Sequence, residues 1–306
     1  MNISPRDALS PRRGIYLGLA AYTLWGCFPV FFKALAGATP LEIVCHRIFW
    51  SAIFLLILVG AKGKLGALWQ VMRNRAILLT LCCSTLLIAT NWLVFLVAIQ
   101  RGEVLQSSLG YFMTPLVSVL LGFVLLRERL RLWQLVSVFC ALLGVMILIF
   151  QHGHVPWIAL TLALSFGAYG LLRKIARVDA MLGLCVETLL LAPLALGFLL
   201  ALETQHLGVF AAGSWRLNLL LPLSGVVTAI PLLLFVGAAR RLRLATIGFL
   251  QYLTPSLHFT LAVFLYREPF TLSQLVSFVF IWCGLALYSV ETFRQSRLVA
   301  RHLSLG

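Results

Sequence analysis

Charged side chains are scarce in this sequence of 306 residues: they make up 11% of it, whereas hydrophobic residues make up 61%. With a mean hydropathy of +1.01, the chain cannot cover a water-facing surface with polar groups, which excludes a soluble globular protein. Apolar runs recur along it, each about 20 residues long, the length that a helix needs to cross a hydrocarbon core of about 30 Å. The composition therefore predicts an all-α integral membrane protein.

The sequence also lacks motifs of catalysis and of nucleotide hydrolysis. It contains no G-x-S-x-G, no H-E-x-x-H, no P-loop and no cluster of carboxylates with a nearby histidine. The seven cysteines lie inside apolar runs without a C-x-x-C, as expected of packing residues rather than disulfides or metal ligands. We therefore expect no catalysis, no cofactor and no ATP-driven motor within the chain, and transport driven by gradients.

Acidic residues are the scarcest charged class, since nine Asp and Glu face 24 Lys and Arg, for a net charge of +15. The basic residues stand in short clusters at the ends of apolar runs, a pattern that orients a protein in the lipid bilayer and does not indicate nucleic-acid binding. Of the Lys and Arg residues, 19 lie on the side of the two termini and four on the other side. Both termini are therefore predicted to be cytoplasmic.

Ten transmembrane helices are predicted from the apolar runs. Their ranges are 15–36, 41–61, 76–99, 104–126, 132–150, 155–174, 181–203, 217–239, 244–265 and 271–291. The first run resembles a signal peptide because arginines precede it, but it is too long for one and shows no clear cleavage site. We expect it to stay as the first span.

An internal duplication organises the chain. The segment 114–137 recurs without a gap 140 positions later, so that Thr114-Pro115 returns as Thr254-Pro255 and Arg127-Glu128 returns as Arg267-Glu268. The same offset relates Gly144 to Gly284. We infer two homologous repeats, whose predicted limits, with the tails, are 1–13 (cytoplasmic tail), 14–150 (first repeat), 154–291 (second repeat) and 292–306 (cytoplasmic tail).

Five is an odd number of spans, so the second repeat must enter the membrane upside down relative to the first. The predicted fold is ten transmembrane helices in two inverted five-helix repeats (5+5). Such repeats are typical of secondary transporters, in which the substrate site lies near the bilayer midplane between the halves. An exchange of conformation between the halves would then open the site to either side.

Three ionisable residues lie deepest in the predicted spans: His46, Arg47 and Glu187. A charge at the centre of a span costs at least about 2.5–3.5 kcal/mol on insertion scales, so each is a functional candidate. Arg47 and Glu187 are equivalent under the 140-residue offset and carry opposite charges, which suggests an ion pair near the pseudo-two-fold axis. A Glu187 freed from such a pair could take up a proton and couple transport to pH. The alternative is that each side chain reaches an interface separately.

Polar and aromatic side chains gather at other mid-span positions. The predicted substrate-binding residues are Trp25, Asn91, Trp92, Tyr111, Tyr169, Gln251 and Tyr252. Each alone could simply bond a neighbouring helix, but their concentration between the halves favours a site for a small-molecule solute.

Four prolines lie inside spans and are expected to break or bend the helices. They are Pro29, Pro115, Pro231 and Pro255. Each removes a backbone hydrogen bond, and the freed carbonyls can serve as ligands or hinges. The alternative is a kink that matters for packing alone.

Short strings in all ten spans carry a resemblance to a known family. They include His46-Arg47, Asn91-Trp92, Ser108-Leu-Gly-Tyr-Phe112 with Pro115, Tyr169-Gly-Leu-Leu-Arg-Lys174, Glu187-Thr188, Val227-Thr228 with Pro231, Gln251-Tyr252 and Phe280-Ile-Trp282. With the 5+5 plan, they make the chain resemble the EamA branch of the drug/metabolite transporter superfamily, and within it the RarD subfamily. One departure is Arg127-Glu-Arg129, where the family pattern has a glycine before the glutamate.

The resemblance implies a permease of the bacterial inner membrane, without a cofactor, that exports small drug-like or metabolic solutes such as amphenicols or amino-acid-like aromatics. Two other functions compete with a secondary transporter. A passive channel or facilitator would share the inverted duplication. An intramembrane enzyme would need facing carboxylates, and no pair of Asp or Glu is placed to provide them.

Overall fold

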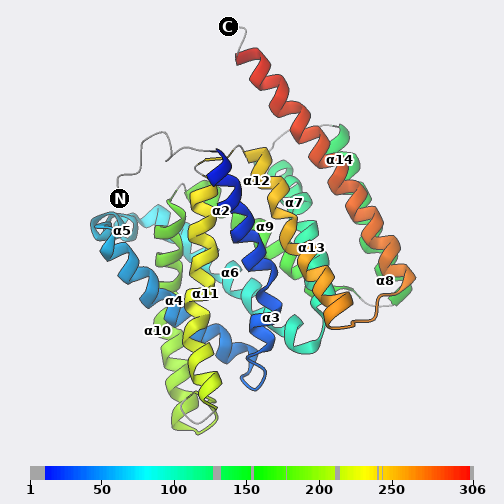
Figure 1. Cartoon of the computed structure of the whole chain (residues 1–306). Coiled ribbons are helices and arrows are strands. Elements are labelled where there is room, and N and C mark those ends of the chain that lie inside the picture. The colour runs from blue at the N-terminus through cyan, green and yellow to red at the C-terminus, as the bar shows by residue number, and fades with distance from the viewer. Residues whose placement is uncertain are drawn as a thin grey trace.

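The computed structural model describes residues 11–126, 132–152, 155–176, 178–210, 214–239, 241–242 and 244–303. Within these ranges the chain is an all-helical bundle, and the N-terminal end of α2 and the C-terminal end of α14 lie at the same end of it (Figure 1). An even number of membrane crossings produces this arrangement. Arg127-Glu128 of the repeated string, and residues 1–10 of the predicted N-terminal tail, lie outside the described residues.

Each predicted span corresponds to one helix or to a broken helix. The first half contains α2 (Pro11–Gly26), α3 (Phe28–Lys33), α4 (Pro40–Ala61), α5 (Leu65–Arg73), α6 (Arg75–Arg101), α7 (Val104–Leu126) and α8 (Leu132–His152). The second half contains α9 (Trp157–Ala176), α10 (Ala180–Thr204), α11 (Trp215–Ala239), α12 (Leu244–Gln251), α13 (Leu253–Thr260), the π-helix η1 (Leu261–Leu265) and α14 (Leu272–Leu303).

Hydropathy and length support a membrane fold for this bundle. Eight helical stretches of the described chain are long and apolar enough to cross a membrane, and two shorter apolar helices, Trp157–Arg173 and Leu253–Leu265, bring the number to ten. Large apolar side chains cover the outside of the bundle, as a lipid-facing surface requires. The predicted fold class, ten transmembrane helices in a 5+5 arrangement, is confirmed.

Several element limits differ from those predicted. The connection 62–75 contains the helix α5, which buries Leu68 and contacts α6 and α10. At the other end of the chain, α14 continues to Leu303, well past the predicted end at 291. Basic residues terminate an apolar run but do not terminate a helix, so a hydropathy argument places the membrane boundary rather than the last helical turn.

The four prolines expected to break helices do not act alike. Pro29 follows an interruption at Cys27, where α2 gives way to α3, and Pro255 follows one at Tyr252. In contrast, Pro115 and Pro231 lie inside the continuous helices α7 and α11, so the expectation of a break is wrong for these two. A single proline removes one backbone bond, which the neighbouring turns of a membrane helix can absorb.

The two halves repeat their local structure at the 140-residue offset. Thr39 caps the N-terminus of α4 through its side chain, and Asp179, its equivalent, caps α10 in the same way. Between α8 and α14, which lie side by side in Figure 1, a Cβ added to Gly144 would stand 2.8 Å from the Ser277 carbonyl oxygen. A Cβ added to Gly284 would stand 2.7 Å from the Ser137 oxygen. The offset of 140 residues converts each of these two contacts into the other, as expected of helices that pack across a pseudo-two-fold axis.

Candidate functional site

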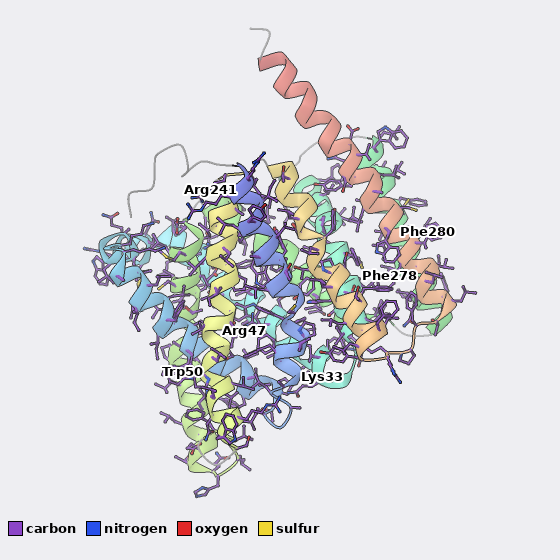
Figure 2. The ribbon with its side chains drawn as sticks, viewed as in Figure 1. Lys33, Arg47, Trp50, Arg241, Phe278 and Phe280 are labelled. Atoms are coloured by element: carbon purple, nitrogen blue, oxygen red, sulfur yellow. The ribbon has the colours of Figure 1, made fainter. Side chains whose placement is uncertain are left out.

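Arg47 occupies a buried position between the halves. The residue is 3% exposed and lies near mid-height of the bundle (Figure 2). Its Nε donates a hydrogen bond to the Thr228 hydroxyl of α11 at 2.7 Å. The guanidinium carbon lies 4.2 Å from the Trp92 ring centroid and 5.1 Å from that of Phe32. Helices α3, α4 and α6 of the first half and α11 of the second therefore meet at one guanidinium, which the ring faces stabilise.

Asn91 joins three helices by hydrogen bonds. Its side-chain amide nitrogen donates to the Ser165 hydroxyl at 3.0 Å and to the Leu162 carbonyl at 3.1 Å, both on α9. Its amide oxygen accepts from the Tyr111 hydroxyl of α7 at 3.1 Å. Two predicted site residues, Asn91 and Tyr111, are thus in direct contact.

His258 connects this polar group to the first span. Its ring stacks on Phe95 with a centroid distance of 5.4 Å and contacts the Tyr111 ring edge to face at 5.7 Å. The Nε2 atom lies 3.1 Å from the carbonyl oxygen of Trp25, and Nδ1 lies 3.5 Å from the Ser107 hydroxyl. The predicted residue Trp25 therefore reaches the cluster through its backbone. We call Arg47, Trp92, Asn91, Tyr111, Thr228 and His258 the central cluster.

Glu187 has a separate set of partners. It is 1% exposed, and its two carboxylate oxygens accept from the Ser84 hydroxyl at 2.6 Å and from the Tyr169 hydroxyl at 3.1 Å. Arg173, near the end of α9, lies 3.8 Å away through Nη1. The predicted residue Tyr169 therefore belongs to the surroundings of Glu187, and its ring leads back to Tyr111 through Phe166, with both centroid distances at 6.0 Å.

The predicted ion pair between Arg47 and Glu187 is not formed in this structure. Arg47 turns to α11, and Glu187 turns to α6 and α9. Since α11 and α6 are equivalent helices of opposite halves, the pseudo-two-fold symmetry sends the two charges to corresponding places rather than to each other. The offset identified equivalent positions, but equivalence does not imply contact.

His46 points away from both groups. Its Nδ1 accepts from the Trp50 indole nitrogen at 3.3 Å, and its ring lies 5.0 Å from Phe210 in the connection after α10. Consecutive helical residues leave the axis about 100° apart. The proximity of His46 to Arg47 in sequence therefore does not bring the imidazole to the central cluster.

Tyr252 and Gln251 are not among the residues that form the central cluster. Tyr252 lines an apolar pocket of about 350 Å³. Its lining residues are Phe112, Tyr252, Trp282, Leu285, Ala286, Ser289 and Val290. Gln251 is half-buried at the C-terminal end of α12. Both residues lie where the ninth span is interrupted, between α12 and α13.

Some residues of the site lacked an obvious sequence signal. Thr228, Ser165 and Ser84 are small polar residues of a kind common in membrane helices, where most bond to their own backbone. The duplication offered one clue, because Ser84 and Ser224 are equivalent and both are fully buried, although Ser84 bonds to Glu187 of the opposite half and Ser224 bonds to the Leu221 carbonyl of its own helix. Phe95 and Phe166 look like ordinary lipid-facing residues in the sequence.

A further contact between the halves lies at the end of the bundle opposite the termini. The carboxylate of Glu268 accepts from the backbone N–H groups of Val104 and Leu105, each at 2.8 Å, and so caps α7. Burial raises the pKa of Glu268, while the two amide donors and Lys33 oppose this shift. The Lys33 ammonium lies 3.7 Å from the Tyr266 ring centroid. These bonds join the connection before α14 to α3 and α7.

Comparison with known proteins identifies the family. Residues 12–150 and 155–290 each match the model of the EamA-like transporter family. The chain belongs to this family. Within the described part of this EamA-like transporter, no three His, Cys, Asp or Glu side chains are grouped closely enough to hold a metal ion.

Relatives over nearly the whole length extend this result. Protein RarD of Escherichia coli K12 is 40% identical over 298 residues, which cover 96% of this chain and 100% of the relative. An uncharacterized transporter of Vibrio cholerae is 43% identical over 295 residues (96% and 98%). The chloramphenicol-sensitive protein RarD of Pseudomonas aeruginosa is 33% identical over 293 residues (94% and 97%). The resemblance to the RarD subfamily is confirmed, and the protein is a multi-pass membrane transporter.

A solved crystal structure shows the same fold. It is 19% identical in sequence, with a TM-score of 0.57 over 94% of this chain and 99% of that one. This similarity extends to the helical architecture and carries no information on substrate.

Proposed function

We propose that the protein is a secondary transporter that moves a small organic solute by alternating access, with the central cluster as its binding site. The observation that carries this proposal is that the cluster draws polar and aromatic groups from both halves. Arg47, Trp92 and Tyr111 come from the first half, and Thr228 and His258 come from the second. A solute held there would contact both units that must move relative to each other.

Asymmetry between the halves supports the alternating mechanism. Helix α4 packs extensively along α11, whereas the equivalent pair, α10 and α6, is in looser contact. Likewise, Thr114 bonds to the Gly110 carbonyl of its own helix, whereas its equivalent Thr254 bonds to the Tyr22 carbonyl of α2 at 2.9 Å. The same sequence plan thus adopts two conformations in one molecule, and their exchange is the step that would reverse access.

We place the protein in the bacterial inner membrane with both termini in the cytoplasm, and assign export as its direction. The excess of Lys and Arg on the side of the termini supports the orientation. Solutes with an aromatic ring and hydrogen-bonding edges, such as amphenicols or amino-acid-like aromatics, match the aromatic walls and polar groups of the cluster. A proton is the coupling ion proposed here, with Glu187 as its carrier.

Reconstituted protein tests this function. Proteoliposomes loaded with unlabelled chloramphenicol or phenylalanine should accelerate the entry of the labelled solute, and the rate should saturate. Tyr111→Phe, which keeps the ring and removes the bond to Asn91, should weaken apparent affinity by about tenfold. Leu194→Ala on the exposed surface of α10 is the control, and it should leave both the apparent affinity and the maximal transport rate unchanged.

A passive facilitator is the competing function. It would show flux proportional to concentration and no acceleration by solute on the opposite side. Such a result with folded protein would replace alternating access by a channel.

A further inference from the structure

The guanidinium of Arg47 has donor capacity that the described protein does not use. It offers five N–H donors. Nε bonds to Thr228, but Nη1 is buried and has no acceptor among the described residues. A buried donor without an acceptor is costly and rare in native proteins. Arg47 therefore has an unpaired hydrogen-bond donor at the point where the two halves meet.

Its charge is also uncompensated by carboxylates in the described chain. Three buried or half-buried carboxylates of the bundle have other partners: Glu187 lies beside Arg173, Glu42 accepts from the Val209 N–H, and Glu268 caps the N-terminus of α7. A cation in a membrane interior ordinarily pairs with an anion or lines a solute pathway. The aromatic faces around Arg47 stabilise it less than a carboxylate would.

The residues around the unpaired Nη1 of Arg47 indicate which kind of ligand would fit there. Trp92, Phe32 and Phe28 present ring faces to the guanidinium, the last at 5.5 Å. These walls suit a planar or apolar body, and the single cation suits a single negative charge. A dianionic phosphate would call for further cations, and no Lys or other Arg shares this aromatic enclosure in the described structure.

We propose that Arg47 is an anion subsite that binds the carboxylate of an aromatic or apolar monocarboxylate solute. The carboxylate of the solute accepts a hydrogen bond from Nη1, while the ring or apolar body of the solute packs against Trp92 and the neighbouring phenylalanines. This proposal rests on the transporter function above and narrows its solute class. Neutral amphenicols would then be weaker ligands than carboxylates of similar size.

Calorimetry on the purified full-length protein compares phenylacetate with phenylacetamide, which has the same shape without the charge, at matched ionic strength. Wild-type protein should bind phenylacetate at least about tenfold more tightly. Arg47→Gln should abolish this preference, and Arg47→Lys should keep part of it. Arg101→Gln is the matched control, because Arg101 is exposed and contacts the ring of Trp157 outside the cluster.

Equal affinity of wild-type protein for the two probes, or binding of neither, would overturn the proposal without recourse to a variant. Retention of the preference in folded Arg47→Gln would overturn it as well. Should Arg47→Gln fail to fold, the wild-type comparison and Arg47→Lys decide.

Transport separates this inference from the function on which it rests. Saturable exchange of a neutral solute that phenylacetate does not inhibit would leave the transporter standing and remove the anion subsite. Arg47-dependent binding of phenylacetate without saturable transport of any solute would confirm the anion subsite and overturn the transporter function.

Discussion

Some buried ionisable residues of this membrane protein have partners that compensate their burial. Glu187 illustrates this at 1% exposure, because two hydroxyl donors and one guanidinium surround its carboxylate. The Arg173 guanidinium also approaches the carbonyl oxygens of Asp179 and Ala180, at 3.4 and 3.3 Å, and so ties the end of α9 to the start of α10. The acidic residue is thus a junction between α6, α9 and α10.

Glu187 and Arg173 should therefore be energetically coupled. Removing either partner of a buried pair leaves the other uncompensated, at a typical cost of about 3–5 kcal/mol, and the 3.8 Å separation here places the expected loss for Glu187→Ala near the lower end. A double-mutant cycle with Arg173→Ala, read by thermal unfolding in detergent, should give a coupling energy above about 0.5 kcal/mol.

The same cycle between Arg47 and Glu187 is the contrast. Their effects should add, because each has its own partners in this structure. Strong coupling between Arg47 and Glu187, together with additivity for Arg173 and Glu187, would contradict this arrangement and restore the ion pair predicted from the duplication.

Helix pairs set the next level of organisation, and close backbone approach is what joins α8 to α14. Gly144 and Gly284 each face a backbone carbonyl of the partner helix, leaving no room for a methyl group. Aromatic packing joins α14 to α7 and α13, where the buried Phe278 contacts Phe112 and Phe259. Helices in lipid associate by such packing rather than by a hydrophobic driving force.

Gly144→Ala should accordingly destabilise the protein by about 1–3 kcal/mol, the usual cost of inserting a methyl group into a filled interface. Gly197→Ala is the control for the same change, because nothing lies within 4 Å of a Cβ at that position of α10. Thermal unfolding should show a lower melting temperature for the first variant alone. Equal melting temperatures would show that α8 and α14 adjust without cost.

The cap that Glu268 places on α7 makes a second element-scale prediction. Glu268→Gln keeps the size of the side chain but removes the charge from two amide bonds, and it should cost about 1–2 kcal/mol at this half-buried site. The exposed Glu203→Gln on α10 should be neutral. If both variants unfold at the wild-type temperature, the link between the halves at this end contributes nothing measurable.

At the scale of the whole molecule, the inverted repeats determine how the chain sits in the membrane. The ends of the described chain lie at one end of the bundle (Figure 1), and the connection after α10 lies at the opposite end, with α5 in the half of the bundle nearer the chain ends. We expect cysteines placed at Arg73 and at His206 of a cysteine-free variant to react with impermeant reagents from opposite sides. The cysteine at position 206 should be labelled in intact cells, whereas the cysteine at position 73 should be labelled only after the cells are lysed. Labelling of both from one side would contradict the ten-span arrangement.

Sequence alone determined the environment, the helical class and the repeat. Long apolar runs allow one backbone solution in lipid, the helix, and a fixed offset between rare residues such as Pro115 and Pro255 is insensitive to packing detail. The family resemblance drew on the same rare residues. Residues expected at the site, among them Asn91, Trp92 and Tyr111, were selected because polar or bulky groups at mid-span are uncommon; their role in substrate binding remains a prediction.

Only the tertiary structure decided which side chains meet. The partners of Arg47 and Glu187 depend on the rotation of α4 and α10 about their axes, which the 140-residue offset does not contain. The chain is interrupted at Cys27 before Pro29 and at Tyr252 before Pro255, but not at Pro115, so a proline in the sequence does not by itself say whether its helix will break. Periodicity along a chain reports the face of a helix, whereas contacts across a membrane depend on how ten such faces pack at once.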